Sequence, residues 1–216
     1  GTRLDSIITL IDAENFSDEI LDGAALPIRH VAYTPCFRRE KMSAGRDVRG
    51  IKRVHQFDKV EQVVVCKADV AEQKDWHGRM IGFVESILQS LALPYRLLQC
   101  CTGDLGAKNE DMIDVECWMP GRGADGPDGR PVGDWGETHS ASRLGDYQCR
   151  RLNLRYRDPE TKKTRFAYSL NNTVAASTRM LIALVENHQN EDGTVTVPEP
   201  LRGYLGGREV LGAPLG

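Results

Sequence analysis

The chain has 216 residues, enough for one sizeable core at the usual ~100–200 residues per domain, and its 40% hydrophobic and 27% charged content is ordinary for a globular protein. Its formal net charge of −3 argues against a uniformly basic nucleic-acid-binding protein, so a polyanion would need a local patch such as the run from Arg38 to Arg53. No apolar run approaches the ~20 residues that span a bilayer, and the first residues do not resemble a signal peptide, so we expect no membrane partner and a cytoplasmic location.

The first predicted elements form a long antiparallel hairpin. Residues 31–40 and 52–66 both have strand composition. The residues between them, KMSAGRDVRGI, are rich in glycine and arginine and break any regular period. This pattern predicts two paired strands with a basic, mobile tip.

An amphipathic helix is predicted over residues 68–91. Asp69 with Glu72 three residues later is typical of a capping box at a helix start. Apolar residues recur at spacings of three and four, which predicts a stripe packed in the core: Trp76, Met80, Phe83, Ile87 and Leu91.

The second half of the chain predicts further strands and one more helix. Residues 95–102 and 111–119 are expected to be strands, and residues 121–134 a Gly/Pro/Asp surface loop. A strand over 165–172 is expected to run into a helix over 173–189, whose buried face holds Met180, Leu181, Leu184 and Val185.

The C-terminal region, residues 194–201, predicts an edge strand, because Pro198 and Pro200 cannot donate to a strand ladder. Long strands that pair as hairpins, with helices packed against them, favour an α+β fold built on an antiparallel β-sheet flanked by helices.

Six cysteines give no metal-site spacing, because none lies in a CxxC pair. We expect them to be buried, reduced thiols: Cys36, Cys66, Cys100, Cys101, Cys117 and Cys149.

Charged and aromatic side chains gather on the predicted hairpin. Arg38 and Glu40 share one strand face, and so do Arg53, Phe57 and Glu61 on the returning strand, because side chains two or four apart point the same way. Arginine forks suit phosphates and carboxylates, and a flat ring suits a purine base. A solvated strand face laced with ion pairs is the other interpretation, and these residues alone leave both open.

Several segments, in the same order along the chain, resemble class II seryl-tRNA synthetases. CFRREKMSAGRDVRGIKRVHQFDKVEQ resembles the motif 2 hairpin of that family, and SLNNTVAASTRMLIALVENHQ resembles its motif 3 strand and helix. Between them, GETHSASRLGDYQCRRLNLRYRD is similar to the ATP- and metal-binding strand, and GTVTVPEPLRGYLGG is similar to the C-terminal stretch. The resemblance runs from about Leu26 onward and implies the fold and activity of that family.

The resemblance implies an ATP site. Arg38 would bridge the α-phosphate and the substrate carboxylate, Phe57 would stack on adenine, and Glu40 would read the adenine amino group. Arg53 would lie near the phosphates and Arg179 would clamp the γ-phosphate, so the three arginines are the expected catalytic residues. The remaining expected ATP contacts are Arg39, Glu137, Thr138, His139 and Ser140, of which Glu137 and Ser140 are the implied Mg²⁺ ligands.

It also implies an L-serine pocket. Glu61 would accept a hydrogen bond from the serine hydroxyl, a pairing that rejects alanine because the carboxylate would then lack a partner. The other expected serine contacts are Asp12, Ala13, Glu14, Arg38, Asn171 and Thr173. Asp12 stands where the family usually has threonine, which brings an extra negative charge towards the serine carboxylate.

The implied reaction is serine activation by ATP followed by transfer to the acceptor end of tRNA(Ser). The family's coiled-coil tRNA arm and motif 1 dimer elements have no counterpart in these 216 residues. We therefore expect residues 1–216 to form an N-terminally truncated catalytic domain, with 1–25 matching weakly and the family's homodimer in question. An amino-acid:carrier-protein ligase and a non-catalytic synthetase-derived fragment are the alternatives.

Overall fold

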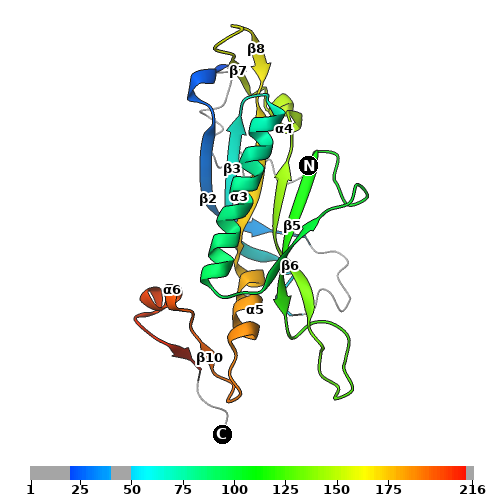
Figure 1. The fold of residues 1–216 in the computed structure, drawn as a ribbon, viewed down its shortest axis with the longest axis vertical. Helices are drawn as coiled ribbons and strands as arrows, with labels where there is room; N and C mark the ends of the chain where they lie inside the picture. Colours follow the sequence, from blue (N-terminus) through cyan, green and yellow to red (C-terminus); the bar gives the residue numbers. More distant parts are fainter. Residues whose placement is uncertain (1–19, 40–49, 213–216) are drawn as a thin grey trace.

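A six-stranded antiparallel sheet forms the centre of the computed structural model, which describes residues 20–39 and 50–212 (Figure 1). All neighbouring strands pair antiparallel, and the fold matches the predicted α+β class. The strands, in their order across the sheet, are β2 (Ile28–Phe37), β3 (Gln56–Cys66), β9 (Tyr168–Ala176), β6 (Asp134–Arg143), β5 (Asp111–Met119) and β4 (Tyr95–Gln99).

Two helices, α3 (Val70–Ser90) and α5 (Ser177–His188), pack on one face of this sheet. Val84 and Leu88 of α3 join Met180 and Ala183 of α5 and Val115 of β5 in one buried cluster. Side chains that alternate away from this cluster line the opposite face, and the candidate site lies there.

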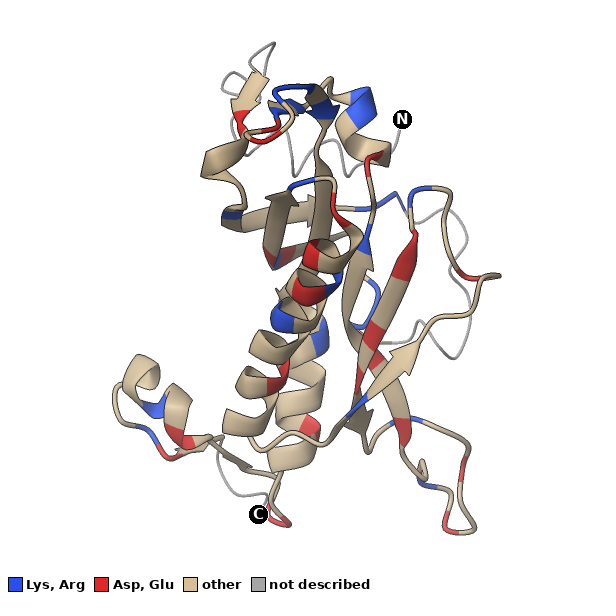
Figure 2. Cartoon of the chain, turned by 45° about the horizontal axis from the view of Figure 1, so that its top comes forward, with Lys and Arg blue, Asp and Glu red and all other residues tan. Residues whose placement is uncertain are grey.

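The remaining elements lie at the two ends of the molecule (Figure 1 and Figure 2). A three-stranded sheet, a short α-helix and a 3₁₀ turn lie at one end, formed by β1 (Ile20–Asp22), β7 (Arg155–Arg157), β8 (Thr164–Phe166), α4 (Tyr147–Arg151) and η1 (Gly23–Ala25). Beyond α5 come β10 (Val195–Thr196), α6 (Glu199–Arg202), η3 (Gly203–Leu205) and β11 (Val210–Leu211). Among the described helices, none has the length and apolar character needed to cross a membrane.

Helix α3 begins as predicted, and its buried face matches the prediction in part, since Met80 and Leu91 are only 1% and 6% exposed. The Asp69 side chain accepts a hydrogen bond from the Glu72 backbone N–H at 2.8 Å. Phe83 and Ile87 are 57% and 36% exposed, so the expectation that they lie in the core is wrong. The buried residues within α3 are Gln73, His77, Met80, Ile81, Val84 and Leu88. The polar side chains of Gln73 and His77 can be buried because backbone carbonyls of β9 and β6 are their hydrogen-bond partners.

The helix predicted over 173–189 starts four residues later than expected. Residues 173–176 continue β9, where Thr173 pairs with Glu61 of β3. β-branched Thr173 and Val174 suit this pairing, and Ser177 then begins α5. The shift matters because it places the Thr173 hydroxyl beside the Glu61 carboxylate.

Other boundaries also differ from the predictions. Residues 52–55 precede β3, and the strand predicted over 95–102 ends at Gln99. The predicted C-terminal edge strand is only the two-residue β10, which pairs with β11, while residues 199–202 are helical. Of the cysteines, Cys66, Cys117 and Cys149 are buried as expected, whereas Cys101 is exposed; all six are free thiols.

Candidate active site

A cavity on the open face of the sheet gathers residues from three strands, from the residue that follows β2, from the turn before β3 and from the start of α5. Strand register brings them together, because β9 pairs with both β3 and β6 and so places β3, β9 and β6 side by side. The lining residues are Arg38, Lys52, Arg53, Val54, Phe57, Lys59, Glu137, Thr138, Ser140, Thr173, Ala176, Thr178 and Arg179. Eight of them are residues that the sequence analysis predicted for the site.

One end of the cavity pairs a guanidinium with an aromatic ring. The Arg38 guanidinium carbon lies 5.1 Å from the centre of the Phe57 ring, a cation–π distance. Arg38 follows β2, and its backbone N–H donates to the His55 carbonyl at 2.8 Å, which closes the hairpin there. This end can receive a flat base on the ring and an anionic group on the guanidinium.

Arg179 and Glu137 form an ion pair at another wall of the cavity. Arg179 Nη1 lies 3.0 Å from Glu137 Oε1 and donates to the Glu137 backbone carbonyl at 3.1 Å. Arg179 Nε also donates to the Lys52 carbonyl at 3.5 Å. The guanidinium therefore ties the first turn of α5 to β6 and to the turn that enters β3.

The third feature is a buried carboxylate beside the cavity: Thr173 lines the cavity, whereas the predicted residues Glu61 and Asn171 do not. Glu61 is 3% exposed, and its two oxygens accept from Asn171 Nδ2 at 2.7 Å and Thr173 Oγ1 at 3.1 Å. Lys59 Nζ lies 3.8 Å from Glu61 Oε2. A carboxylate offers about four lone-pair sites, so it retains capacity for a hydroxyl or ammonium group of a ligand.

The oxygen donors on β6 suit a hard cation. Glu137 and Ser140 line the cavity three residues apart on the strand. Among residues 20–39 and 50–212, no group of three or more His, Cys, Asp and Glu side chains is placed to hold a metal ion. Mg²⁺ commonly binds through one or two carboxylates while phosphates and water complete its shell, so this donor set fits Mg²⁺ held together with a phosphate-bearing ligand.

Some predicted site residues do not line this cavity. Arg39 is exposed beyond the end of β2. His139 is buried, and its ring nitrogens contact the Thr138 hydroxyl at 2.8 Å and the Val174 carbonyl at 3.0 Å. Burial lowers the pKa of His139 to about 4, so the imidazole is neutral near pH 7. Glu40, Asp12, Ala13 and Glu14 lie outside the described residues.

Three lysines near the site were not predicted. Lys59 lies between Phe57 and Glu61 on one strand face, so strand alternation could have identified it. Lys52 lies in the turn before β3, where no local pattern applies. Lys108 comes from the connection between β4 and β5; burial lowers its pKa, and the charges of Glu61 and Lys59 act on it in opposite directions.

Comparison with known proteins identifies the family of this chain. Residues 11–188 match the model of the tRNA synthetase class II core domain (G, H, P, S and T). A serine–tRNA ligase of Deinococcus radiodurans is 50% identical over 93% of this chain and 44% of its own length. A serine–tRNA ligase of Pyrococcus furiosus is 45% identical over 90% of this chain and 40% of its own length.

Solved structures give the same result. The seryl-tRNA synthetase of Pyrococcus horikoshii complexed with ATP superposes with a TM-score of 0.81 at 43% identity, covering 94% of this chain and 42% of that one. The cytoplasmic serine–tRNA ligase of Naegleria fowleri in complex with AMP gives 0.80 at 36% identity, covering 92% and 44%. This chain thus spans about two fifths of the length of its relatives. Because the family model matches most of the chain, the protein belongs to the class II tRNA synthetase core family.

Proposed function

We propose that this protein activates L-serine with ATP to form seryl-adenylate and, as part of the complete enzyme, transfers serine to the 3′ end of tRNA(Ser). The observation that carries the proposal is the buried Glu61 carboxylate, held by Asn171 and by Thr173, a residue that also lines the cavity of the Arg38–Phe57 pair. One site then offers both an amino-acid pocket and a nucleotide platform.

The nucleotide would occupy the end formed by Arg38 and Phe57. The Phe57 ring can stack on adenine, and the Arg38 guanidinium can fork between the α-phosphate and a carboxylate. Arg179 would meet the γ-phosphate, and Arg53 would lie near the phosphates. Support also comes from the ATP complex of the similar Pyrococcus horikoshii enzyme.

Serine would bind with its hydroxyl on Glu61. The site is built to satisfy a hydroxyl donor, because the carboxylate is buried and an analogue without the hydroxyl would leave it underpaired. Asn171 and Thr173 fix the orientation of the carboxylate, so they would act through Glu61 on the choice of substrate.

The chemistry would be an in-line displacement. The serine carboxylate would attack the α-phosphorus and pyrophosphate would leave. A hydroxyl of the terminal ribose of tRNA would then attack the acyl carbon of the mixed anhydride, and AMP would leave as the acyl–phosphate bond breaks. No protein nucleophile is needed, and Arg38 and Arg179 supply positioning and charge neutralisation. Glu137 and Ser140 would hold Mg²⁺, which when bound offsets the negative charge of the phosphates.

Serine-dependent exchange of pyrophosphate into ATP tests the activation step. The assay uses the full 216-residue chain with a panel of amino acids, and Arg38→Ala is the matched loss-of-function variant. Exchange with serine that disappears in Arg38→Ala supports the proposal. Exchange with glycine or alanine but not serine would overturn the substrate, and no exchange with any amino acid would overturn activation by this chain. Three further parts belong to the proposal. An acylation assay tests whether tRNA(Ser) is charged, and sedimentation tests whether the chain forms the dimer of its family. The assignment of residues 1–216 to one catalytic domain is the third part.

A further inference from the structure

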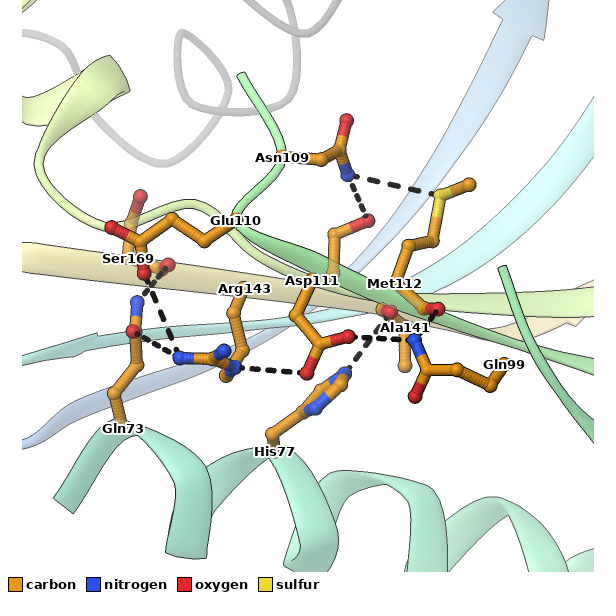
Figure 3. Close-up of polar contacts among 11 residues, drawn as sticks. Gln73, His77, Gln99, Asn109, Glu110, Asp111, Met112, Ala141, Arg143 and Ser169 are labelled. Carbon is orange, nitrogen blue, oxygen red and sulfur yellow. Dashed lines mark hydrogen bonds and ion pairs between the residues drawn. The ribbon is translucent and has the colours of Figure 1, made fainter. Parts of the chain in front are cut away.

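On the face of the sheet that carries α3, a buried arginine at the end of β6 contacts both α3 and β5 (Figure 3). Arg143 is the last residue of β6 and is 8% exposed. Its Nε donates to Asp111 Oδ2 at 3.3 Å, its Nη1 donates to Gln73 Oε1 at 3.2 Å, and Nη1 lies 3.6 Å from Glu110 Oε2. A buried guanidinium needs such partners, because removing one leaves an uncompensated charge.

Helix α3 extends this network to two central strands. Gln73 Nε2 donates to the Ser169 carbonyl of β9 at 3.2 Å, and His77 Nε2 contacts the Ala141 carbonyl of β6 at 3.0 Å. Figure 3 shows both side chains rising from one side of α3 towards the strands. Burial lowers the pKa of His77, so the ring is neutral and can donate to a carbonyl without adding charge beside Arg143.

The network adjoins the residues that hold Glu61. Arg143 pairs with Leu170 across β6 and β9, and the next pair is Ser142 with Asn171. Asn171 donates to Glu61 Oε1 at 2.7 Å. Displacement of β9 at Ser169 or of β6 at Arg143 would therefore be passed to Asn171 within one or two residues.

We propose that Arg143, with Asp111 and Gln73, is a positioning residue that sets the serine pocket by fixing β9 against β6 and α3. The inference rests on the proposed function and deepens it. Arg143 does not touch the substrate; it acts through the backbone of residues 169–171 and the Asn171 amide. The nucleotide end, carried by Arg38 and Phe57, lies at the other end of β3 from this network, because Leu170 beside Arg143 pairs with Val64, seven residues along β3 from Phe57.

The test compares Arg143→Gln, Arg143→Lys and Asp111→Asn with the control His188→Ala. His188 Nε2 contacts the Leu91 carbonyl at 2.9 Å, so it also ties two helices together but lies at the other end of the core. Two measurements are made on each full chain: the KM values for serine and ATP in pyrophosphate exchange, and amide hydrogen exchange of residues 168–173 by mass spectrometry.

We expect Arg143→Gln to raise the KM for serine about tenfold while the KM for ATP changes less than about twofold. Asp111→Asn should raise the KM for serine less. Arg143→Lys should give a KM for serine between those of wild type and Arg143→Gln, because lysine keeps the positive charge but lacks the planar set of donors of the guanidinium. Amides 168–173 should exchange faster in Arg143→Gln and not in His188→Ala.

Equal rises in both KM values, or a serine KM that also rises in His188→Ala, would overturn the positioning role in favour of general stability. Unchanged exchange at 168–173 in Arg143→Gln would overturn it too. If the wild-type chain gives no serine-dependent activity, the proposed function fails instead, and the hydrogen-exchange comparison still decides whether Arg143 fixes β9. Should Arg143→Gln fail to fold, Asp111→Asn carries the same comparison.

Discussion

Arg179 Nη1 lies 3.0 Å from Glu137 Oε1, so the residue proposed for the γ-phosphate is paired with the residue proposed for Mg²⁺. Glu137 is 42% exposed and Arg179 is 14% exposed on their side chains, which leaves the carboxylate accessible from the cavity. Binding of Mg²⁺ and ATP would give each partner a new counter-charge. Before the nucleotide binds, the Arg179–Glu137 ion pair would hold α5 against β6. ATP and Mg²⁺ would then replace this contact as partners of the two side chains.

Arg179→Ala should lower the rate of pyrophosphate exchange about 100-fold, because a charged donor aimed at the transferring phosphates is lost. Steady-state exchange over a range of ATP concentrations measures the effect. Arg202→Ala, which breaks the remote pair with Glu209, is the control and should stay close to wild type. An Arg179→Ala rate within twofold of wild type would remove Arg179 from the site.

Glu137→Gln should raise the Mg²⁺ concentration needed for half-maximal exchange about tenfold, since a neutral amide is a weaker ligand for a hard cation. A titration of Mg²⁺ at saturating ATP and serine gives this value. Glu209→Gln, on an exposed pair with Arg202, serves as the matched control. Identical Mg²⁺ curves for Glu137→Gln and wild type would argue that the metal lies elsewhere.

Glu61→Gln should reduce kcat/KM for serine by at least about 100-fold and narrow the preference for serine over alanine, because a buried hydroxyl acceptor is lost. Both amino acids are compared in the exchange assay. Circular dichroism checks folding, since Asn171 and Thr173 also lose their acceptor. A variant that keeps its serine-to-alanine ratio would contradict the assignment of Glu61.

Phe57→Leu should raise the KM for ATP about five- to tenfold, because stacking and the cation–π contact with Arg38 together contribute about 1 kcal/mol. The KM for serine should change little. The more distant ring of Phe166, which packs on Arg150, provides Phe166→Leu as a control. Equal changes for the two substrates would place Phe57 outside the nucleotide end.

The buried His139 predicts a pH dependence of stability. The pKa of His139 is about 4 in the folded state against the ordinary value of 6.5, so the unfolded state binds more protons between these two pH values. The stabilisation is fully present above pH 6.5 and is lost as the pH falls towards 4, by about 3 kcal/mol in all. Urea unfolding at pH 7, 6, 5 and 4 should show a shallower decline for His139→Gln than for wild type. Parallel declines would show that another group causes the loss.

Local patterns along the sequence already specified much of the hairpin. Alternation placed Phe57 and Glu61 on one strand face, and the structure brings Lys59 onto the same face between them. The cap at Asp69 was likewise readable, because an N-cap and the residue three positions later interact within one turn. Such signals depend on neighbours only a few residues away.

The helix stripe shows where local patterns fail. Phe83 and Ile87 have the spacing of core residues but are exposed, whereas Gln73 and His77 are buried because carbonyls of β9 and β6 accept their hydrogen bonds. The burial of a polar side chain depends on the partner it finds, and that partner lies 64 or more residues away in the sequence. Helical periodicity contains no information about that partner.

The sequence by itself determined the fold class, the order of the main strands and helices, and the family resemblance that named Arg38, Phe57, Glu61, Glu137 and Arg179. Only the tertiary structure decided that Thr173 lies on β9 beside Glu61, that Arg179 pairs with Glu137, and that Arg143 joins α3 to β5. The physical reason is that strand register and helix packing set these contacts. Both arise from burial and hydrogen bonding between segments far apart in the chain.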